Sequence, residues 1–360
     1  MHNPTLFLNH LEKITYRYVE DEKPQEGCYQ KQRKELKIFS CPIETRAELL
    51  TLEHSVNGNV QTESLWSFSR IHGEALTYSV GFYLIDGKLS VKSEPAYCFF
   101  QTKEETHLNF IIHAPFLLTP DRQHLKDGEP HNNEMLSSLA CLAADCFAYL
   151  KNIGAEEGTC LIDDEILSIV PTLASDFYDQ TQAYNYYSRK YEKKNIGEKT
   201  FCPFYKRIVE KFKSDELLPA DGAYVNAKHA YWAEDTSLVN LFENESLSKL
   251  VNTADSKWIM LSKPRTGVDA TYREWLENVI GIGHVLNEDF FLQSISSSFC
   301  EEKFKNEPDW FVCLYEWLDS AKKRSEIAKR MPIFIDENGF ALQAYKNEIL
   351  QIFLPVEEKK

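Results

Sequence analysis

The chain has few glycines and prolines, 14 of each in 360 residues, so little in it indicates long disordered linkers. It also lacks a run of about 20 apolar residues, which a membrane-spanning helix needs. The first residues, MHNPTLFLNHLEKITYRY, lack the basic start and long apolar core of a signal peptide. No C-x-x-C pair occurs among the nine cysteines, and Cys98 and Cys313 lie in apolar segments. We therefore expect buried, reduced thiols and a cytoplasmic location.

The chain also has fewer basic residues than acidic ones. The chain has 40 Lys and Arg against 55 Asp and Glu, which leaves a net charge of −15. A total of this size and sign disfavours broad contact with nucleic acid phosphates or with anionic lipid, although it leaves room for a local basic pocket. We therefore expect no membrane partner, and the charge argues against nucleic acid as a partner.

Motifs that would identify an enzyme are missing too. G-I-G-H at 281–284 lacks the other glycines and the lysine of a phosphate-binding loop, and no G-x-S-x-G elbow occurs. Glu274 and Asn278 have the spacing of an ATPase carboxylate and its magnesium-ligand asparagine. Glu302 and Asn306 repeat that spacing by chance, and no D-x-G-x-G follows either pair. No local pattern therefore identifies a general acid, a general base or a nucleophile.

Four histidines lie close together in the sequence, at positions 107, 113, 124 and 131, and two cysteines follow at 141 and 146. Zinc ligands come as closely spaced pairs, which this stretch does not contain. We therefore expect no metal site. His113 lies within an apolar, strand-like segment, and we interpret it as a packed core residue.

The first part of the chain, residues 1–155, has the pattern of an α+β domain. After a polar stretch at 19–27 that indicates a loop, five segments are rich in β-type residues. The last two are almost continuously apolar, which suggests strands covered on both faces. Apolar residues then recur at helical spacing over 132–154, with Gly154 as a natural stop. The five expected strands are 36–43, 63–70, 75–86, 96–102 and 108–116.

The second part, residues 156–360, has the pattern of a mainly helical domain with strands near its end. Amphipathic spacing predicts helices at 202–214 and 308–330, and Asn338-Gly339 predicts a hairpin turn. Between 178 and 199 the chain is rich in tyrosine and charge. We expect Tyr184, Tyr187 and Tyr191 to share one face of a helix that packs or lies at the surface, with a stacking platform for bases as the alternative.

One stretch resembles a known family. Residues 96–140 contain Phe99-Phe100, then LNFIIHAPFLLT, then Asp121-Arg122, and then Asn132 or Asn133 before a helix. This pattern resembles the segment just downstream of the ATPase module in sacsin-like proteins. These belong to the superfamily of gyrase, heat-shock-ninety chaperones, histidine kinases and MutL. The resemblance is tight over 94–150 and looser elsewhere, for example at SLWSFSR and LPADGAYVNA.

The resemblance implies a middle-domain fold, similar to the second domain of ribosomal small-subunit protein five, followed by an α-rich domain. In the chaperone relatives this domain presents a loop-borne arginine to the γ-phosphate of a nucleotide. By that match Arg122 would be the catalytic residue, acting in trans, and Thr119 and Lys126 would be its polar partners at the nucleotide. Local pairing of Arg122 with Asp121, Asp127 or Glu129 is the alternative.

The family binds ATP and Mg in a separate N-terminal module, and the motifs of that module are not present here as an ordered set. We therefore expect no cofactor in this chain. The chain looks like the portion that begins where the module ends, either cut from a longer protein or standing alone.

The expected function is that of a non-catalytic transducer and protein-interaction region of a sacsin-like, chaperone-type ATPase. Its partners would be its own or a neighbouring ATPase module and a client or partner protein, and relatives often form homodimers. Two alternatives stay open. One is an accessory or nuclease-type enzyme of a bacterial defence system, and the other is a purely structural scaffold.

Overall fold

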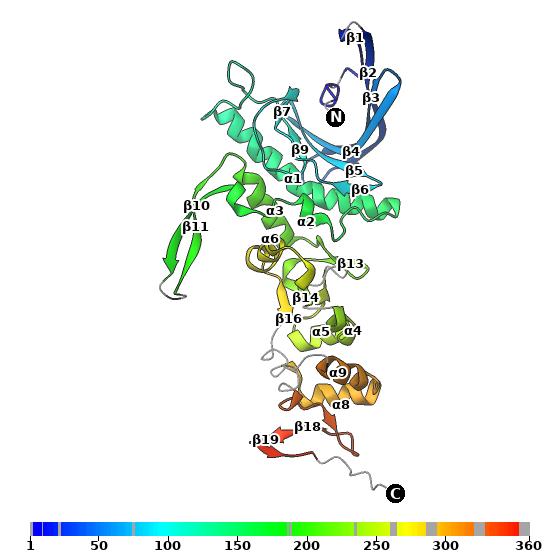
Figure 1. Cartoon of the computed structure of the whole chain (residues 1–360), viewed down its shortest axis with the longest axis vertical. Coiled ribbons are helices and arrows are strands. Elements are labelled where there is room, and N and C mark those ends of the chain that lie inside the picture. The colour runs from blue at the N-terminus through cyan, green and yellow to red at the C-terminus, as the bar shows by residue number, and fades with distance from the viewer. Residues whose placement is uncertain are drawn as a thin grey trace. The chain divides into compact units, whose positions relative to one another are not determined.

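The computed structural model describes residues 3–8, 10–20, 23–73, 76–185, 187, 189–233, 236–259, 265–285, 294–319 and 328–352. The chain forms two compact units, residues 1–217 and 218–360 (Figure 1). This division lies well beyond residue 155, where we expected the boundary. The reason is that helix α3 (Cys202–Ser214) shares its core with helix α1 (Pro130–Glu157), as the Phe147 and Phe212 rings, 5.2 Å apart, illustrate.

A nine-stranded sheet forms the centre of the first unit. Its order is β1-β2-β3-β4-β5-β9-β7-β8, with β6 paired to β5, and only the β7–β9 pair is parallel. The α+β class is therefore as expected, and the sheet is almost entirely antiparallel. The strands are β1 (Lys13–Glu20), β2 (Lys23–Phe39), β3 (Thr45–Val56), β4 (Asn59–His72), β5 (Leu76–Ile85), β6 (Lys88–Ser90), β7 (Tyr97–Cys98), β8 (Phe100–Gln101) and β9 (Ile111–His113).

Two expectations about these strands were wrong. Residues 19–20 and 23–27 are not a loop, because β1 continues to Glu20 and β2 begins at Lys23, while residues 21 and 22 lie outside the described part of the chain. The ring of Tyr16 on β1 lies 5.5 Å from that of Tyr29 on β2, which supports this pair. The second error concerns 96–102, which forms two very short strands instead of one. Phe99 adopts a left-handed backbone (φ 63°) between them, and this reverses the chain.

Helix α1 covers one face of the sheet. Side chains alternate along β4, so that Trp66, Phe68 and Arg70 point to the helix and the residues between them point to the opposite face. The predicted helix is confirmed, but its end is not at Gly154. It continues to Glu157 and is capped by Gly158 (φ 65°). Gly154 lies inside the helix, and a glycine suits this position because a Cβ atom there would come within 2.8 Å of the Thr159 carbonyl oxygen.

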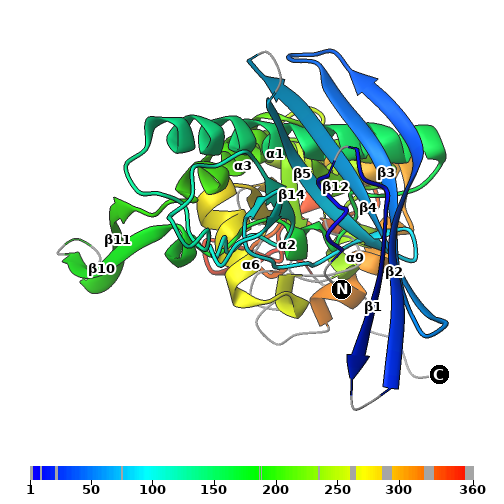
Figure 2. The ribbon, with the colours of Figure 1, turned by 90° about the horizontal axis from the view of Figure 1, so that it is seen from above.

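The tyrosine-rich segment is a β-hairpin, and the expected helix is wrong. Strands β10 (Tyr178–Asn185) and β11 (Lys190–Glu198) pair antiparallel and extend away from the sheet and helices of their own unit (Figures 1 and 2). Larger side chains (Tyr and Gln) alternate with smaller ones along β10, which suits a two-residue period as well as a helical one. The remaining short elements of this unit are α2 (Ile166–Ile169) and the 3-10 turn η1 (Ala174–Asp176).

The second unit combines helices with short strands. Its 3-stranded parallel sheet has the order β15-β14-β16, and its other strands form two-stranded hairpins. The strands are β12 (Leu218–Ala220), β13 (Ala223–Val225), β14 (Ala230–Ala233), β15 (Lys257–Trp258), β16 (Gly283–Val285), β17 (Phe334–Ile335), β18 (Ala341–Leu342), β19 (Tyr345–Lys346) and β20 (Ile349–Leu350). The helical elements are η2 (Ala227–His229), α4 (Thr236–Leu241), α5 (Asn244–Val251), η3 (Arg265–Gly267), α6 (Ala270–Glu274), the π-helical turn η4 (Trp275–Ile280), α8 (Ser297–Asn306) and α9 (Trp310–Asp319).

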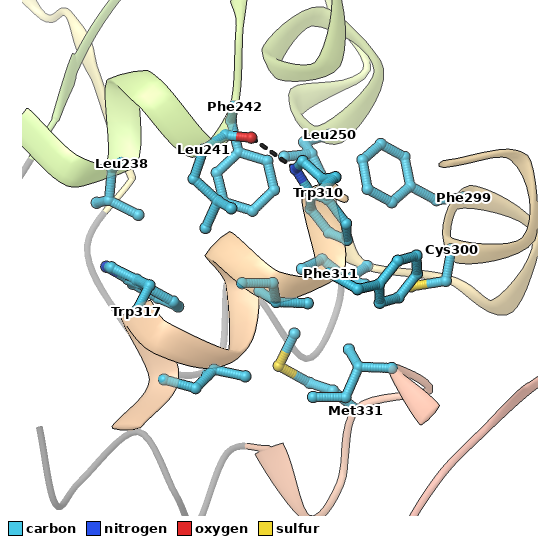
Figure 3. Close-up of a cluster of buried hydrophobic side chains, with 14 of the residues drawn as sticks. Leu238, Leu241, Phe242, Leu250, Phe299, Cys300, Trp310, Phe311, Trp317 and Met331 are labelled. Atoms are coloured by element: carbon cyan, nitrogen blue, oxygen red, sulfur yellow. Dashed lines mark hydrogen bonds between the residues drawn. The ribbon is translucent and has the colours of Figure 1, made fainter. Parts of the chain in front are cut away.

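The core of the second unit combines phenylalanine and tryptophan rings with leucine side chains (Figure 3). The buried Trp310 indole donates its Nε1 hydrogen to the Leu241 carbonyl oxygen at 2.7 Å, which joins α9 to the end of α4. The predicted helix 308–330 is present as α9, and its residues 320–327 lie outside the described part of the chain. The hairpin turn at Asn338-Gly339 is confirmed, with Gly339 at φ 85° between β17 and β18.

Candidate functional site

Residues 117–126, here called the Arg122 loop, join the region after β9 to helix α1. The ends of the loop are tied together by the backbone, because the Lys126 amide donates to the Leu117 carbonyl oxygen (2.9 Å) and the Thr119 amide donates to that of His124 (2.9 Å). Leu118 and Leu125 add an antiparallel bridge between them. The loop is therefore closed at its base like a small hairpin.

Asn132 fastens this base to helix α1. Its amide nitrogen donates to the carbonyl oxygens of Leu117 (2.8 Å) and Lys126 (3.0 Å), and its side-chain oxygen accepts from the Leu117 amide (2.8 Å). Asn132 is buried, so each of these polar groups needs its partner. Of the two asparagines considered from the sequence, Asn132 makes these contacts, and it lies in the first turn of the helix.

Thr119 shapes the tip of the loop. Its hydroxyl donates to Asp121 Oδ1 (2.6 Å), and the Gln123 amide donates to the same oxygen (3.1 Å). Both hydrogen bonds, with Thr119 contributing most, lower the pKa of Asp121. The Arg122 amide donates to the Thr119 carbonyl oxygen (2.8 Å). Thr119 therefore holds the turn that carries Arg122.

Arg122 is exposed at this tip and has a left-handed backbone, φ 59°, which is uncommon for a residue with a Cβ atom. Its side chain makes no hydrogen bond or ion pair with any residue that the structure describes. Asp121 is engaged by Thr119, and Glu129 forms an ion pair with Lys126. The positive charge of Arg122 partly opposes the burial that raises the pKa of the nearby Cys98 thiol.

The loop thus brings Thr119 and Arg122 together, and it places Lys126 at its end, already paired. Thr119 is half-buried and its hydroxyl is used within the loop, so Arg122 is the one of these three predicted residues whose side-chain polar atoms are all available among the described residues. A guanidinium presents a planar fork of donors that matches the oxygens of a phosphate or carboxylate. The loop can therefore offer an anion a fixed cationic contact at the surface.

A second feature is the sheet face opposite α1, here called the open face, which the sequence analysis missed. Small hydroxyl side chains meet there across β4 and β5, because Ser69 pairs with Ser79 and Ser67 lies two residues along. They border a cavity of about 110 Å³ that Arg33 and Glu48 also line. Serines at alternate positions of β4 are the signal that could have revealed it.

The segment 3–8 covers one end of the open face and is held there by Lys31. The Lys31 ammonium is buried and donates to the carbonyl oxygens of Thr5 (2.8 Å) and Leu8 (2.8 Å). Burial lowers the pKa of Lys31 to about 8. Leu6 and Phe7 pack into the apolar part of the same face. This lysine therefore acts as a clamp on the N-terminal segment.

His113 lies beside that segment on β9. Its ring stacks on Phe7 at 4.5 Å and meets Phe99 edge-on at 5.3 Å. Neither ring nitrogen has a hydrogen-bond partner among the described residues. Burial lowers the pKa of His113 to about 3, so the ring is neutral at physiological pH. His113 is thus a packed residue, as interpreted, but its polar atoms are not satisfied.

Within the described ranges, no group of three or more His, Cys, Asp and Glu side chains is placed to hold a metal ion. In the same part of the chain, no helix combines the length and apolar character that crossing a bilayer requires. Comparisons with protein-family models, with curated proteins and with solved structures found no match. We therefore infer function from the geometry of the Arg122 loop.

Proposed function

We propose that this chain is a non-catalytic transducer and protein-interaction region of a sacsin-like, chaperone-type ATPase. In this proposal its N-terminal part is a middle domain, and Arg122 is offered to a nucleotide held by a separate module. The observation that carries the proposal is the state of Arg122, an exposed guanidinium, unpaired among the described residues, on a loop closed by its own hydrogen bonds.

The physical reason is preorganisation. An arginine already paired with a carboxylate would have to break that pair before it reached a phosphate. Arg122 has no such pair among the described residues, and Asn132 and Thr119 fix the loop that carries it. Delivered from a second domain, the guanidinium would neutralise the charge that develops on the transferred phosphate only when the two domains are together. Hydrolysis would then be coupled to domain docking.

The test measures ATP hydrolysis by the nucleotide-binding module encoded with or beside this chain, with and without the chain. We expect the chain to raise turnover, and Arg122→Ala to remove most of the increase, since such an arginine supplies on the order of 10³ in rate. Arg122→Lys should recover little, because an ammonium lacks the planar fork. Arg46→Ala is the matched control, since Arg46 is exposed and pairs with Glu44 elsewhere on the unit.

Equal stimulation by the wild type and Arg122→Ala would contradict the role of Arg122. Calorimetry on the chain alone gives a second check, because the proposal assigns the nucleotide pocket to another module. Tight binding of ATP and Mg by the isolated chain would therefore exclude the transducer function.

A further inference from the structure

The hairpin formed by β10 and β11, residues 178–198 and here called the arm, has almost no contact with the body of its unit. It joins that body at Tyr178, whose ring meets Tyr205 edge-on at 5.8 Å. None of its described residues is buried. A two-stranded hairpin with both faces in water is marginally stable. An arm of this kind is therefore suited to contact something outside the unit.

The outer part of the arm has a charge opposite to that of the chain. Residues 185–194 contain four cations, Arg189, Lys190, Lys193 and Lys194, and one anion, Glu192, for a net charge of +3. Because the whole chain carries −15, the other residues carry −18. None of the four cations forms an ion pair with another residue in the described ranges, so their charge is available to a partner.

The acidic body does not cancel this charge at the arm. Each strand residue advances the chain by about 3.3 Å, so the three lysines stand roughly 10 to 23 Å from Tyr178, Lys194 nearest and Lys190 farthest, and Arg189 lies beyond Lys190 toward the tip. Charges in water are screened beyond about 8 Å at physiological ionic strength. A polyanion that approaches the outer arm therefore meets mainly its local positive charge, which the total for the chain conceals.

Tyrosines lie among these cations. Tyr184 and Tyr191 face each other across the two strands, with ring centroids 5.2 Å apart, and Tyr191 is 72% exposed. Tyr187, close to the tip, is fully exposed, and its amide donates to the Asn185 side chain (2.9 Å), which shapes the turn. Exposed rings between cations are what single-stranded nucleic acid needs, since bases stack on the rings and phosphates contact the cations.

We propose that the arm binds single-stranded nucleic acid. An acidic protein surface is the competing partner, but lysine is depleted in protein interfaces, and three of the four cations here are lysines. Duplex fits less well, because its stacked bases are closed to the tyrosine rings. Lys190, Lys193 and Lys194 would contact phosphates, and Tyr187 and Tyr191 would stack on bases.

The test is fluorescence anisotropy with labelled oligothymidylate of about 20 nucleotides, titrated with the full chain at several salt concentrations. For single strands, removing one lysine that binds a phosphate lowers the slope of log K against log salt by about 0.7. We therefore expect the triple variant Lys190→Ala, Lys193→Ala, Lys194→Ala to bind more weakly, with a slope smaller by about 2. The control Lys13→Ala, Lys34→Ala, Lys213→Ala removes three exposed lysines elsewhere and should keep the wild-type slope.

Tyr187→Ala should weaken binding by about 5- to 150-fold, the range for loss of one stacked base, whereas Tyr187→Phe should retain most of it. Far-UV circular dichroism checks that each variant is folded. Failure to bind the oligonucleotide at about 50 mM salt, or equal losses in the two triple variants, would overturn the proposal. Equal affinity for duplex and for the single strand, together with no effect of Tyr187→Ala, would also overturn the proposal.

Sedimentation velocity without nucleic acid tests whether the arm instead binds a second copy of this chain. Salt-sensitive self-association that disappears in the arm variant, together with no oligonucleotide binding, would overturn the proposal and show that the arm docks on a second copy of this chain.

Discussion

His113 makes the folded first unit sensitive to acid, and the size of the effect follows from its surroundings. The ring is enclosed by Phe7 and Phe99, and burial lowers its pKa from 6.5 to about 3. Between these two values the unfolded chain binds a proton that the folded state does not bind. The free energy of unfolding must therefore fall as the pH falls through this window, and it is fully restored above about pH 6.5.

The magnitude can be worked out for an accessible interval. Between about pH 7.5 and pH 5.0, protonation of a histidine with a pKa of 6.5 stabilises the unfolded chain by about 2 kcal/mol, while the folded state stays unprotonated. Carboxylates also contribute to acid unfolding, so the useful quantity is the difference between the wild type and a variant that cannot titrate. His113→Phe keeps an aromatic ring in the site and removes both unsatisfied nitrogens.

We expect the His113→Phe variant to lose about 2 kcal/mol less than the wild type between these two pH values. At the higher pH it should be no less stable than the wild type. His113→Gln should show the same reduced pH dependence but be less stable at the higher pH, because it buries an amide without partners. Hydrogen exchange of peptides from β5 and β9, measured by mass spectrometry, reports on this unit alone. Parallel pH profiles for the wild type and both variants would refute the reasoning.

Two further predictions test the packing of each unit. Arg70 is buried and donates hydrogen bonds to Asp145 (2.8 Å), Tyr149 (3.1 Å) and Thr45 (2.7 Å). Arg70→Met should therefore destabilise the first unit by about 3 kcal/mol. This is the low end for a broken buried pair, because Lys211 still contacts Asp145. Adding Asp145→Leu should recover part of this loss in the same exchange experiment, and a double variant less stable than the single one would contradict the assignment. Trp310→Phe should destabilise the second unit by about 1 to 3 kcal/mol, because the Leu241 carbonyl oxygen loses its buried donor. Urea unfolding followed by the fluorescence of the other tryptophans checks this, and an unchanged midpoint would count against it.

The sequence predicts best those elements that are specified by their own residues. Apolar spacing over 132–154 identifies α1 because the side chains on that stripe, such as Leu139 and Phe147, are buried as the spacing requires. Asp86-Gly87 and Asn338-Gly339 identify two turns, because Asp86, Gly87 and Gly339 adopt left-handed backbones that favour these residue types. The end of α1 is less certain from sequence, since Gly154 and Gly158 are both suitable stops and only the left-handed backbone of Gly158 in the structure distinguishes them.

The arm shows where such reasoning fails. Tyr184, Tyr187 and Tyr191 are spaced by three and four residues, as on one face of a helix, but Tyr184 and Tyr191 are also cross-strand partners around a turn. Both arrangements bring these rings close, so the spacing alone cannot choose between them. A helix would need an apolar stripe to bury, and residues 178–198 have none. The absence of that stripe was therefore the better signal, because it argued against the helix.

The Arg122 loop has one feature that the sequence predicts and one that it does not predict. Thr119-Pro120-Asp121 predicts a sharp turn because proline and aspartate favour one locally. The sequence does not predict that the Arg122 guanidinium is unpaired among the described residues, since three carboxylates lie within seven residues of it. Two of these carboxylates have other partners, because Asp121 accepts a hydrogen bond from Thr119 and Glu129 forms an ion pair with Lys126. Thr119→Val would release Asp121, and the guanidinium would then gain a local partner. If Arg122 acts on an anion, that variant should weaken its effect, because Asp121 would then compete for the guanidinium, and Asp121→Asn in the same chain should restore it.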